Sequence, residues 1–257
     1  MHLKSISQMA SLMLRFRNGL DLVARMRAGQ PFDEVIFWDG TRIAHPPERG
    51  GLAEAVVELC LERTYTADFY RPANGDVIVD AGANIGLFAI QMARQNRRCR
   101  VVALEPFPEN FQYLQANVAR RYAETITCCE VALGEASGTG HMQPGARSLD
   151  HVLRLDSTGA NGVPVIPLSE LFDLARAQEI DFLKVDIEGS EHRVFAAASP
   201  AVLGRYKRIA MEYHDHIVPG TLELLHHVLT PTHDIKVRPS TMEGCGILLA
   251  LRRDLKK

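Results

Sequence analysis

Several features that would place a chain in another class of protein are missing from this sequence of 257 residues. Its five cysteines form no Cys-x-x-Cys pair and no regular spacing, which argues against a disulfide framework and predicts free thiols in a reducing cytoplasm. No run of about 18 apolar residues occurs, so no membrane-spanning helix is expected. A formal net charge of −2, with one tryptophan and 7% aromatic residues, argues against a nucleic-acid partner.

The composition that remains is typical of a soluble globular protein, with 46% hydrophobic and 23% charged residues. The length fits one large α/β domain with a small N-terminal cap. We expect the cap in residues 1–70 and the main domain in residues 71–257. The boundary is placed there because Pro72 and the Asn74-Gly75 pair precede a regular alternation of strands and helices.

The cap is predicted to contain an amphipathic helix over residues 3–28, a hairpin over residues 35–43 and a second helix over residues 52–63. Apolar residues recur at helical spacing in the first segment; they are Met9, Leu12, Met13, Phe16, Leu20 and Val23. Basic residues there outnumber the single acid, Asp21. A cap or homodimer helix, a helix lying on a membrane surface and a targeting peptide all fit this pattern.

A strand, a glycine-containing turn and a helix open the main domain. Residues 77–79 are β-branched and apolar, as in a buried parallel strand, and Asp80 follows them. Gly82, Asn84 and Gly86 then form a turn that suits a nucleotide-like ligand at a helix N-terminus. The spacing differs from the dinucleotide fingerprint, and the Asp80 carboxylate would repel a pyrophosphate. It would attract the ammonium group of S-adenosylmethionine, so the turn favours that cofactor over NAD.

A second acid, Glu105, follows the strand predicted over residues 100–104 and lies 19 residues beyond Gly86. This is about where a carboxylate binds the ribose hydroxyls of an adenosine. A third strand is predicted over residues 125–133. Its register would place three residues near the adenine edge: Glu130, Val131 and Ala132.

Acidic residues also follow the next two predicted strands. In the fourth, Phe182–Ile187, alternation puts Lys184 and Asp186 on one face, and a buried lysine requires a charged partner such as Asp186. Glu188 and Glu191 follow, either at the site or capping the next helix. The fifth strand, Arg208–His214, ends with Glu212 and His214. His214 is the best candidate for a general base, although a solvated histidine is the simpler alternative.

The remaining predicted segments give less information about function. Residues 137–164 form a long irregular excursion, from which Ser148 and His151 could face a substrate. Helices are expected over residues 169–178, with Ser169 as N-cap, and over residues 222–229. Strands over residues 234–237 and 246–251 would close the sheet.

Taken together, these motifs resemble the FkbM-type methyltransferases over about residues 60–252. The resemblance rests on Asp80-Ala-Gly-Ala-Asn-Ile-Gly86, Glu105-Pro106, Lys184-Val-Asp-Ile-Glu-Gly-Ser-Glu191 and Glu212-Tyr-His214. It implies the class I methyltransferase fold, an α/β Rossmann-like arrangement with a seven-stranded, mostly parallel sheet and an antiparallel last strand. It also implies Asp80, Gly82, Asn84 and Glu105 as cofactor contacts and residues 184–191 as part of the active-site floor. Leu168-Ser169 departs from the Leu-Asp pair expected there.

The implied reaction is O-methylation of a sugar or natural-product hydroxyl by S-adenosylmethionine. His214 or Asp186 would take the hydroxyl proton, with Glu212 and Lys184 in support. Alternatively, Asp186 and Glu212 would bind a divalent ion, for which oxygen ligands favour Mg²⁺. Methylation of a nitrogen or of a macromolecule stays open, although no Asn/Asp-Pro-Pro-Tyr-type motif follows the fourth strand. A non-catalytic protein that binds the cofactor stays open too.

Overall fold

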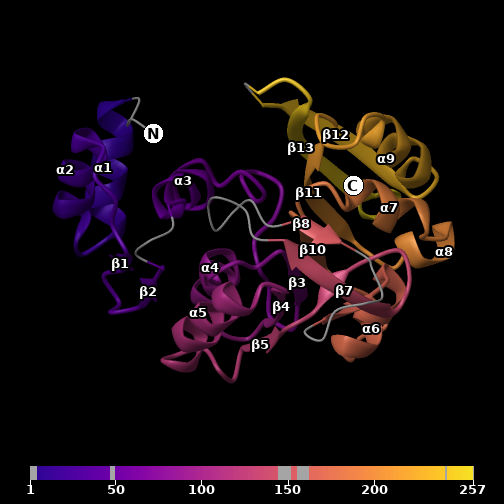
Figure 1. Ribbon diagram of the computed structural model, residues 1–257, viewed down its shortest axis with the longest axis horizontal. Helices are drawn as coiled ribbons and strands as arrows, with labels where there is room; N and C mark the ends of the chain where they lie inside the picture. The colour runs from indigo at the N-terminus through magenta and orange to yellow at the C-terminus, as the bar shows by residue number, and fades with distance from the viewer. Residues whose placement is uncertain (1–4, 47–49, 144–151, 155–161, 241, 257) are drawn as a thin grey trace.

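The computed structural model in Figure 1 describes residues 5–46, 50–143, 152–154, 162–240 and 242–256. Ser148 and His151, the candidates from the excursion, lie outside these ranges. The N-terminal elements lie at the left of Figure 1, and the C-terminal strands β12 and β13 form the right-hand end of the central sheet. No helix in the described ranges is long and apolar enough to cross a membrane.

A seven-stranded sheet forms the centre of the molecule, in the order β12-β13-β11-β10-β3-β4-β5. Five neighbouring strands pair in parallel, whereas β13 pairs antiparallel with both β11 and the edge strand β12. The sheet is therefore mostly parallel with a reversed last strand, which confirms the predicted fold class. The strands are β3 (Val77–Ala81), β4 (Arg100–Leu104), β5 (Ile126–Cys129), β10 (Phe182–Val185), β11 (Arg208–His214), β12 (His233–Pro239) and β13 (Cys245–Arg252).

Helices cover both faces of the sheet because its central strands are apolar on both sides. In β3, Ile78 packs with α4 (Leu87–Gln95), α5 (Pro108–Ala119) and the N-terminal elements. Val77 and Val79 point to the opposite face. There they join a second core with α6 (Leu171–Leu174), α7 (Glu191–Ala196), α8 (Pro200–Leu203) and α9 (Thr221–Leu229).

The N-terminal segment contains two helices, α1 (Ile6–Arg15) and α2 (Gly19–Ala28), so the prediction of one helix over residues 3–28 is wrong. The chain turns between them because the Asn18 side chain bonds to the backbone of Glu34 and Ile36 in the following hairpin. Gly19 allows the close turn, since a Cβ there would come within 2.6 Å of the Leu12 carbonyl oxygen.

The rest of the cap follows the prediction. Strands β1 (Glu34–Ile36) and β2 (Arg42–Ala44) pair as an antiparallel hairpin. Helix α3 (Leu52–Ala55) continues directly into a π-helix, η1 (Val56–Glu62). Buried cap residues such as Leu12 and Val56 belong to the same hydrophobic core as Ile78 of the sheet. The division into a cap of residues 1–70 and a domain of residues 71–257 stays a prediction.

Two predictions for the middle of the chain are wrong. The strand expected over residues 125–133 is broken: β5 ends at Cys129, and β6 (Ala132–Leu133) belongs to a separate small sheet. The excursion of residues 137–164 supplies β7 (Gly138–Gln143), β8 (Val152–Arg154) and the start of β9 (Val163–Ile166) to that sheet. The sequence shows no alternation of apolar and polar residues here because this sheet has only a small core. Among the described residues, that core contains Ala132, Val163 and Val165.

The helix predicted over residues 169–178 is also shorter than expected. A 3-10 turn, η2 (Leu168–Glu170), precedes α6, and Ser169 makes no capping hydrogen bond. Arg176 adopts a φ of 48°, a left-handed conformation that cannot continue a right-handed helix. The helix therefore ends before residue 178.

Candidate active site

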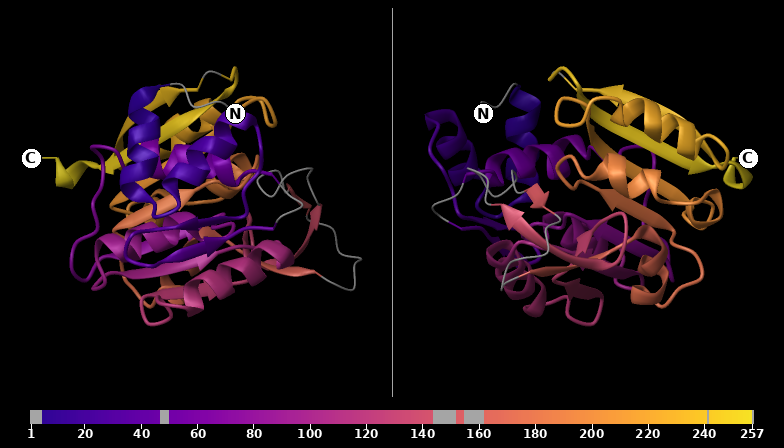
Figure 2. Two further views of the ribbon diagram at one scale, coloured as in Figure 1. Left: turned by 90° about the vertical axis from the view of Figure 1, so that its left-hand side faces the viewer. Right: turned by 45° about the vertical axis from the view of Figure 1, so that its right-hand side comes forward.

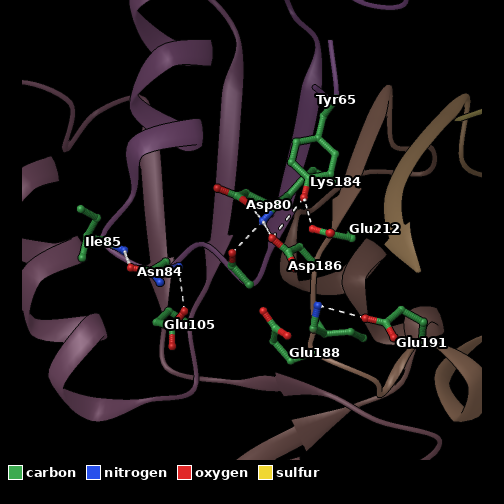
Figure 3. A network of polar contacts seen from close by, with 12 residues as sticks. Tyr65, Asp80, Asn84, Ile85, Glu105, Lys184, Asp186, Glu188, Glu191 and Glu212 are labelled. Atoms are coloured by element: carbon green, nitrogen blue, oxygen red, sulfur yellow. Dashed lines mark hydrogen bonds and ion pairs between the residues drawn. The ribbon is translucent and has the colours of Figure 1, made fainter. Parts of the chain in front are cut away.

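The acidic residues singled out in the sequence converge at one edge of the sheet, because the parallel strands β3, β4, β10 and β11 all end there. Figure 3 shows Asp80, Asp186 and Glu212 close to Lys184 at this edge, with Glu105 beside Asn84. A pocket opens over the turn after β3. Its lining includes Gly82, Asn84, Lys184, Asp186 and Glu58 of η1.

The turn of residues 82–86 is fixed by glycine conformations and by side-chain bonds. Gly82 has a φ of +77°, and a Cβ there would come within 1.8 Å of the Asp186 carbonyl oxygen, so only glycine lets the turn lie against the end of β10. Asn84 has a φ of 51° and accepts a hydrogen bond from the Ile85 N–H on its own side-chain oxygen, at 2.7 Å. The turn is thus held rigidly at the floor of the pocket.

Glu105 links this turn to the end of β4. Its carboxylate accepts hydrogen bonds from the backbone N–H of Asn84 at 2.7 Å and of Phe107 at 2.9 Å. Burial raises the pKa of Glu105 to about 7, although the two N–H groups oppose that rise. Glu105 is therefore placed beside the turn, as the sequence suggested, and its contact with a ribose stays a prediction.

Lys184 and Asp80 form a buried ion pair beneath the pocket. The Lys184 ammonium lies 3.3 Å from Asp80 and 3.5 Å from Asp186, and it donates to the Gly82 carbonyl oxygen at 2.7 Å. The sequence named Asp186 as the partner of Lys184; the structure adds Asp80, which is 0% exposed. Burial raises the pKa of Asp80 to about 6 against the opposing charge of Lys184. The acids that line the pocket itself are Asp186 and Glu58, and a contact of Asp80 with the cofactor stays a prediction.

Two residues of the cap complete the site and were missed in the sequence. The Tyr65 hydroxyl donates to Asp186 at 3.1 Å and lies 3.4 Å from Glu212 (Figure 3). Glu58 lies on η1, and burial, with the charges of Asp186 and Glu212, raises its pKa to about 8. The helical pattern of residues 52–63 placed Glu58 on a helix, but no sequence signal indicated which wall of the pocket it would form.

His214 is held by two acids from the segment after β10. Its Nδ1 lies 3.1 Å from Glu191 and its Nε2 lies 3.6 Å from Glu188. Burial lowers the pKa of His214, but the Glu191 hydrogen bond and the charges of Glu191, Asp186 and Glu188 outweigh it and raise the pKa to about 9. Glu191 is thus buried against His214. Glu188 has a left-handed backbone conformation, with a φ of 50°.

Glu212 and His214 come from the same end of β11, as predicted. Burial and the nearby charge of Asp186 raise the pKa of Glu212, and the Cys245 thiol lies 3.3 Å from its carboxylate. Among the described residues, two groups of three side chains have ligand atoms within 4.8 Å of one another: Glu212, His214 and Cys245, and Asp186, Glu188 and His214. Each group contains one of the two metal candidates named from the sequence, and both groups include His214.

The remaining candidates lie where β5 leaves the main sheet. Glu130 is exposed, whereas Val131 and Ala132 are buried at the break between β5 and β6. They follow the end of the strand next to β4, on the same edge as Glu105. Their position beside an adenine stays a prediction.

Replacing Tyr65 by phenylalanine should lower turnover about tenfold, because Asp186 and Glu212 lose a hydrogen bond worth about 1.5 kcal/mol to a charged group. The ring, which packs edge-on to Phe88 at 6.1 Å, is retained, so the melting temperature should change little. Turnover and thermal unfolding of the wild type and the Tyr65→Phe variant test this. Equal turnover in the two would show that the hydroxyl does not support the site.

Comparisons with known proteins identify the sequences and structures that this chain resembles. The sequence model of a family described as "Methyltransferase FkbM domain" matches residues 80–230. The 31-O-demethyl-FK506 methyltransferase FkbM of Streptomyces tacrolimicus is 28% identical over 220 residues, which is 72% of this chain and 82% of that protein. The hexuronic acid methyltransferase AglP of Haloferax volcanii is 26% identical over 144 residues, 56% of this chain and 58% of that protein. A solved rRNA methylase from Streptococcus thermophilus aligns with a TM-score of 0.46 at 11% identity, covering 70% of this chain and 87% of that one.

The family match spans more than half of the chain, from Asp80 at the end of β3 to the end of α9. The chain therefore belongs to the FkbM methyltransferase domain family. This confirms the resemblance that the motifs indicated. The match begins beyond the cap, so Glu58 and Tyr65 lie outside the matched segment while contributing to the same site.

Proposed function

We propose that the protein transfers a methyl group from S-adenosylmethionine to a hydroxyl of a small molecule, such as a sugar or a natural product. The observation that carries this proposal is the pocket over the turn of residues 82–86, with Asp186 and Glu58 in its walls. Two relatives support a hydroxylated small acceptor by the substrates in their names, FK506 and a hexuronic acid.

The residues present suit the methyl donor. Its sulfonium supplies a methyl carbon already activated for displacement, so the protein has mainly to align the acceptor oxygen and exclude water. The Asp186 carboxylate offers negative charge toward the cationic groups of such a ligand, and Glu58, whose pKa is raised to about 8, adds a polar carboxyl group to the same wall. Glu105 and Asn84 lie at the opposite end of the same turn, where we place the ribose, and residues 130–132 lie beyond them for the adenine.

Asp186 is the residue we assign to the hydroxyl proton. One of its oxygens, Oδ2, is held by Tyr65 and lies near Lys184, whereas Oδ1 is buried and accepts no hydrogen bond from the described part of the chain. A substrate hydroxyl can donate to Oδ1 without replacing a protein hydrogen bond, once the bound substrate uncovers this oxygen. His214, with its raised pKa of about 9, carries a proton at neutral pH, so it serves better to offset the surrounding acids than as a base.

A bound divalent ion is the alternative route to the same proton loss. The donors Asp186, Glu188 and His214 combine oxygen and imidazole ligands, a set that suits Mn²⁺ or Zn²⁺ better than Mg²⁺. A metal there would lower the pKa of the acceptor hydroxyl. Dialysis against a strong chelator separates the two routes, because full activity after chelation excludes the metal route, whereas activity restored only by added metal supports it.

Calorimetric titration with S-adenosylmethionine, followed by a screen for released S-adenosylhomocysteine, tests the proposed function. The screen uses a panel of hydroxylated sugars and polyketides, with amines and nucleic acids as comparison acceptors. Release with hydroxylated acceptors alone is the expected result. Release with amines or nucleic acids would favour nitrogen or macromolecule methylation, and binding without any release would favour a non-catalytic cofactor-binding protein.

The fold should lose stability as the pH rises from about 6.5 to 9. The pKa of His214 is raised from its ordinary 6.5 to about 9 in the folded chain, so the folded state holds this proton more tightly than the unfolded state. The stabilisation is complete below pH 6.5 and is lost as the pH passes 9; we expect a change on the order of 3 kcal/mol.

Urea unfolding at several pH values measures this dependence. A His214→Gln variant should show a flatter profile between pH 6.5 and 9, whereas a His227→Gln variant, altered at an exposed histidine of α9, should keep the wild-type profile. Parallel profiles for the wild type and the His214→Gln variant would contradict the assignment.

A further inference from the structure

A second concave surface lies on the cap, on the other side of η1 from the active-site pocket. It is a cavity of about 600 Å³ bordered by α1, the β1–β2 hairpin, η1 and α4. Leu59 of η1 lines both cavities, while Glu58 faces the active-site pocket and Arg63 faces this one. Figure 2 shows α1 and α2 on the outside of the molecule at this end. The cavity is therefore separate from the proposed methyl-transfer site.

The charged groups of this cavity are all positive. Its lining contains four arginines and no acid: Arg15, Arg63, Arg71 and Arg94. Arg94 is paired with Asp39 at 2.8 Å, which leaves three guanidinium groups with no acidic partner among the described residues. In a chain whose net charge is −2, this is a local concentration of positive charge. Such a surface attracts anions.

Large apolar side chains are exposed to solvent beside these arginines. Leu14 is 78% exposed and Trp38 is 63% exposed, and both line the cavity. Ile6, which is 81% exposed, and Met13 lie on the same face of α1 as Leu14 by their spacing of seven and eight residues. We name Ile6, Met13, Leu14, Trp38, Arg15, Arg63 and Arg71 the N-terminal surface. A soluble partner-free surface rarely combines so many exposed apolar and basic groups.

We propose that the N-terminal surface docks on an anionic lipid bilayer, with the arginines at the phosphate groups and Leu14, Ile6 and Trp38 in the interfacial layer. An amphipathic helix with basic neighbours lies in the plane of such an interface, and tryptophan prefers its headgroup region. A second copy of the chain fits less well. A symmetric dimer centred on this surface would bring two arginine clusters together without an acid between them.

The test uses the native protein, because Trp38 is the sole tryptophan of the chain and reports on the surface itself. Its fluorescence emission is recorded during titration with two kinds of vesicle: phosphatidylcholine alone, and phosphatidylcholine with about one third phosphatidylglycerol. The titrations are repeated with vesicles that carry brominated acyl chains. The expected result is a blue shift and bromine quenching with anionic vesicles only, both weakened by salt. Sedimentation with the vesicles gives the bound fraction.

Variants on exposed positions locate the contact. An Arg15→Gln/Arg71→Gln double variant should weaken vesicle binding at least about tenfold, since each basic residue near an anionic surface contributes about a fivefold change. Leu14→Gln should weaken it comparably. The matched controls, Arg98→Gln/Arg120→Gln and Met242→Gln, change exposed residues outside this surface and should bind as the wild type does.

Three outcomes overturn the proposal. A blue shift that depends on protein concentration without lipid, with a dimer in sedimentation, would assign the surface to a second copy. Saturation by inorganic phosphate without vesicle binding would assign it to a soluble anion. Emission that stays unchanged with every vesicle, or equal binding by the arginine variant and its control, would exclude bilayer docking. None of these readouts depends on methyl transfer.

Discussion

An Asp186→Asn variant should lower kcat by about 10²- to 10⁴-fold, the usual contribution of a positioned group that accepts a proton in the transition state. Asparagine keeps the size of the side chain and can still accept the Tyr65 hydrogen bond on its amide oxygen. It cannot take a proton from the acceptor hydroxyl. Because Asp186 also offers negative charge to the donor, the dissociation constant of S-adenosylmethionine should rise, but by no more than about tenfold.

Release of S-adenosylhomocysteine measures kcat, and calorimetry measures donor binding. Glu223→Gln, a carboxylate-to-amide change at an exposed position of α9, is the matched control and should leave both unchanged. An Asp186→Asn enzyme with kcat within a factor of two of the wild type would remove Asp186 as the base. In that case the next candidate is Glu212, the other acceptor of the Tyr65 hydroxyl.

Replacing Asp80 by asparagine should destabilise the fold by about 3–5 kcal/mol, because it leaves the Lys184 ammonium buried with its nearest carboxylate gone. Asp80 is 0% exposed and Lys184 is 3% exposed, so water cannot replace the lost charge. The same ion pair holds Lys184 against the Gly82 carbonyl oxygen, and donor binding should therefore weaken as the turn loosens.

Urea unfolding of the Asp80→Asn variant measures the loss. An Asp80→Asn/Lys184→Met double variant removes both charges and should recover much of the stability, since the buried ammonium left with Asp186 alone, rather than the missing pair, causes the damage. If Asp80→Asn unfolds like the wild type but binds S-adenosylmethionine poorly, Asp80 acts on the cofactor directly, as the sequence first suggested. If stability and binding are both unaffected, the pair has neither role.

The main sheet and the positions of its acids were predictable because parallel strands leave simple signals. The apolar run at residues 77–79 predicted β3, and the apolar residues on either side of Lys184 predicted β10; the acids after each strand had to meet at one edge. The hairpin of residues 35–43 followed from its Asp-Gly turn. These are local patterns whose structural outcome does not depend on distant parts of the chain.

The break in the N-terminal helix and the two missed site residues depend on contacts that sequence spacing does not encode. The break at residues 16–18 depends on Asn18 bonding to a strand 16 to 18 residues away. Tyr65 and Glu58 reach the site only because the cap packs over the end of the sheet. Tyr65, for example, is 121 residues away from Asp186 in the sequence. Asp80 lies at the end of β3 as predicted, but its ion pair with Lys184 was not foreseen, because strand alternation fixes the face of a side chain and not which neighbour covers it.

The hydroxyl of Tyr65 and the carboxyl of Glu58 arrive from segments that the family match does not include. Grafting residues 5–70 of a relative onto this sheet would therefore exchange chemistry along with shape. A chimera whose donated segment lacks an equivalent phenol would be expected to fold, bind the donor and turn over slowly. The range of acceptors and the catalytic rate would then change together, because both depend on the grafted segment.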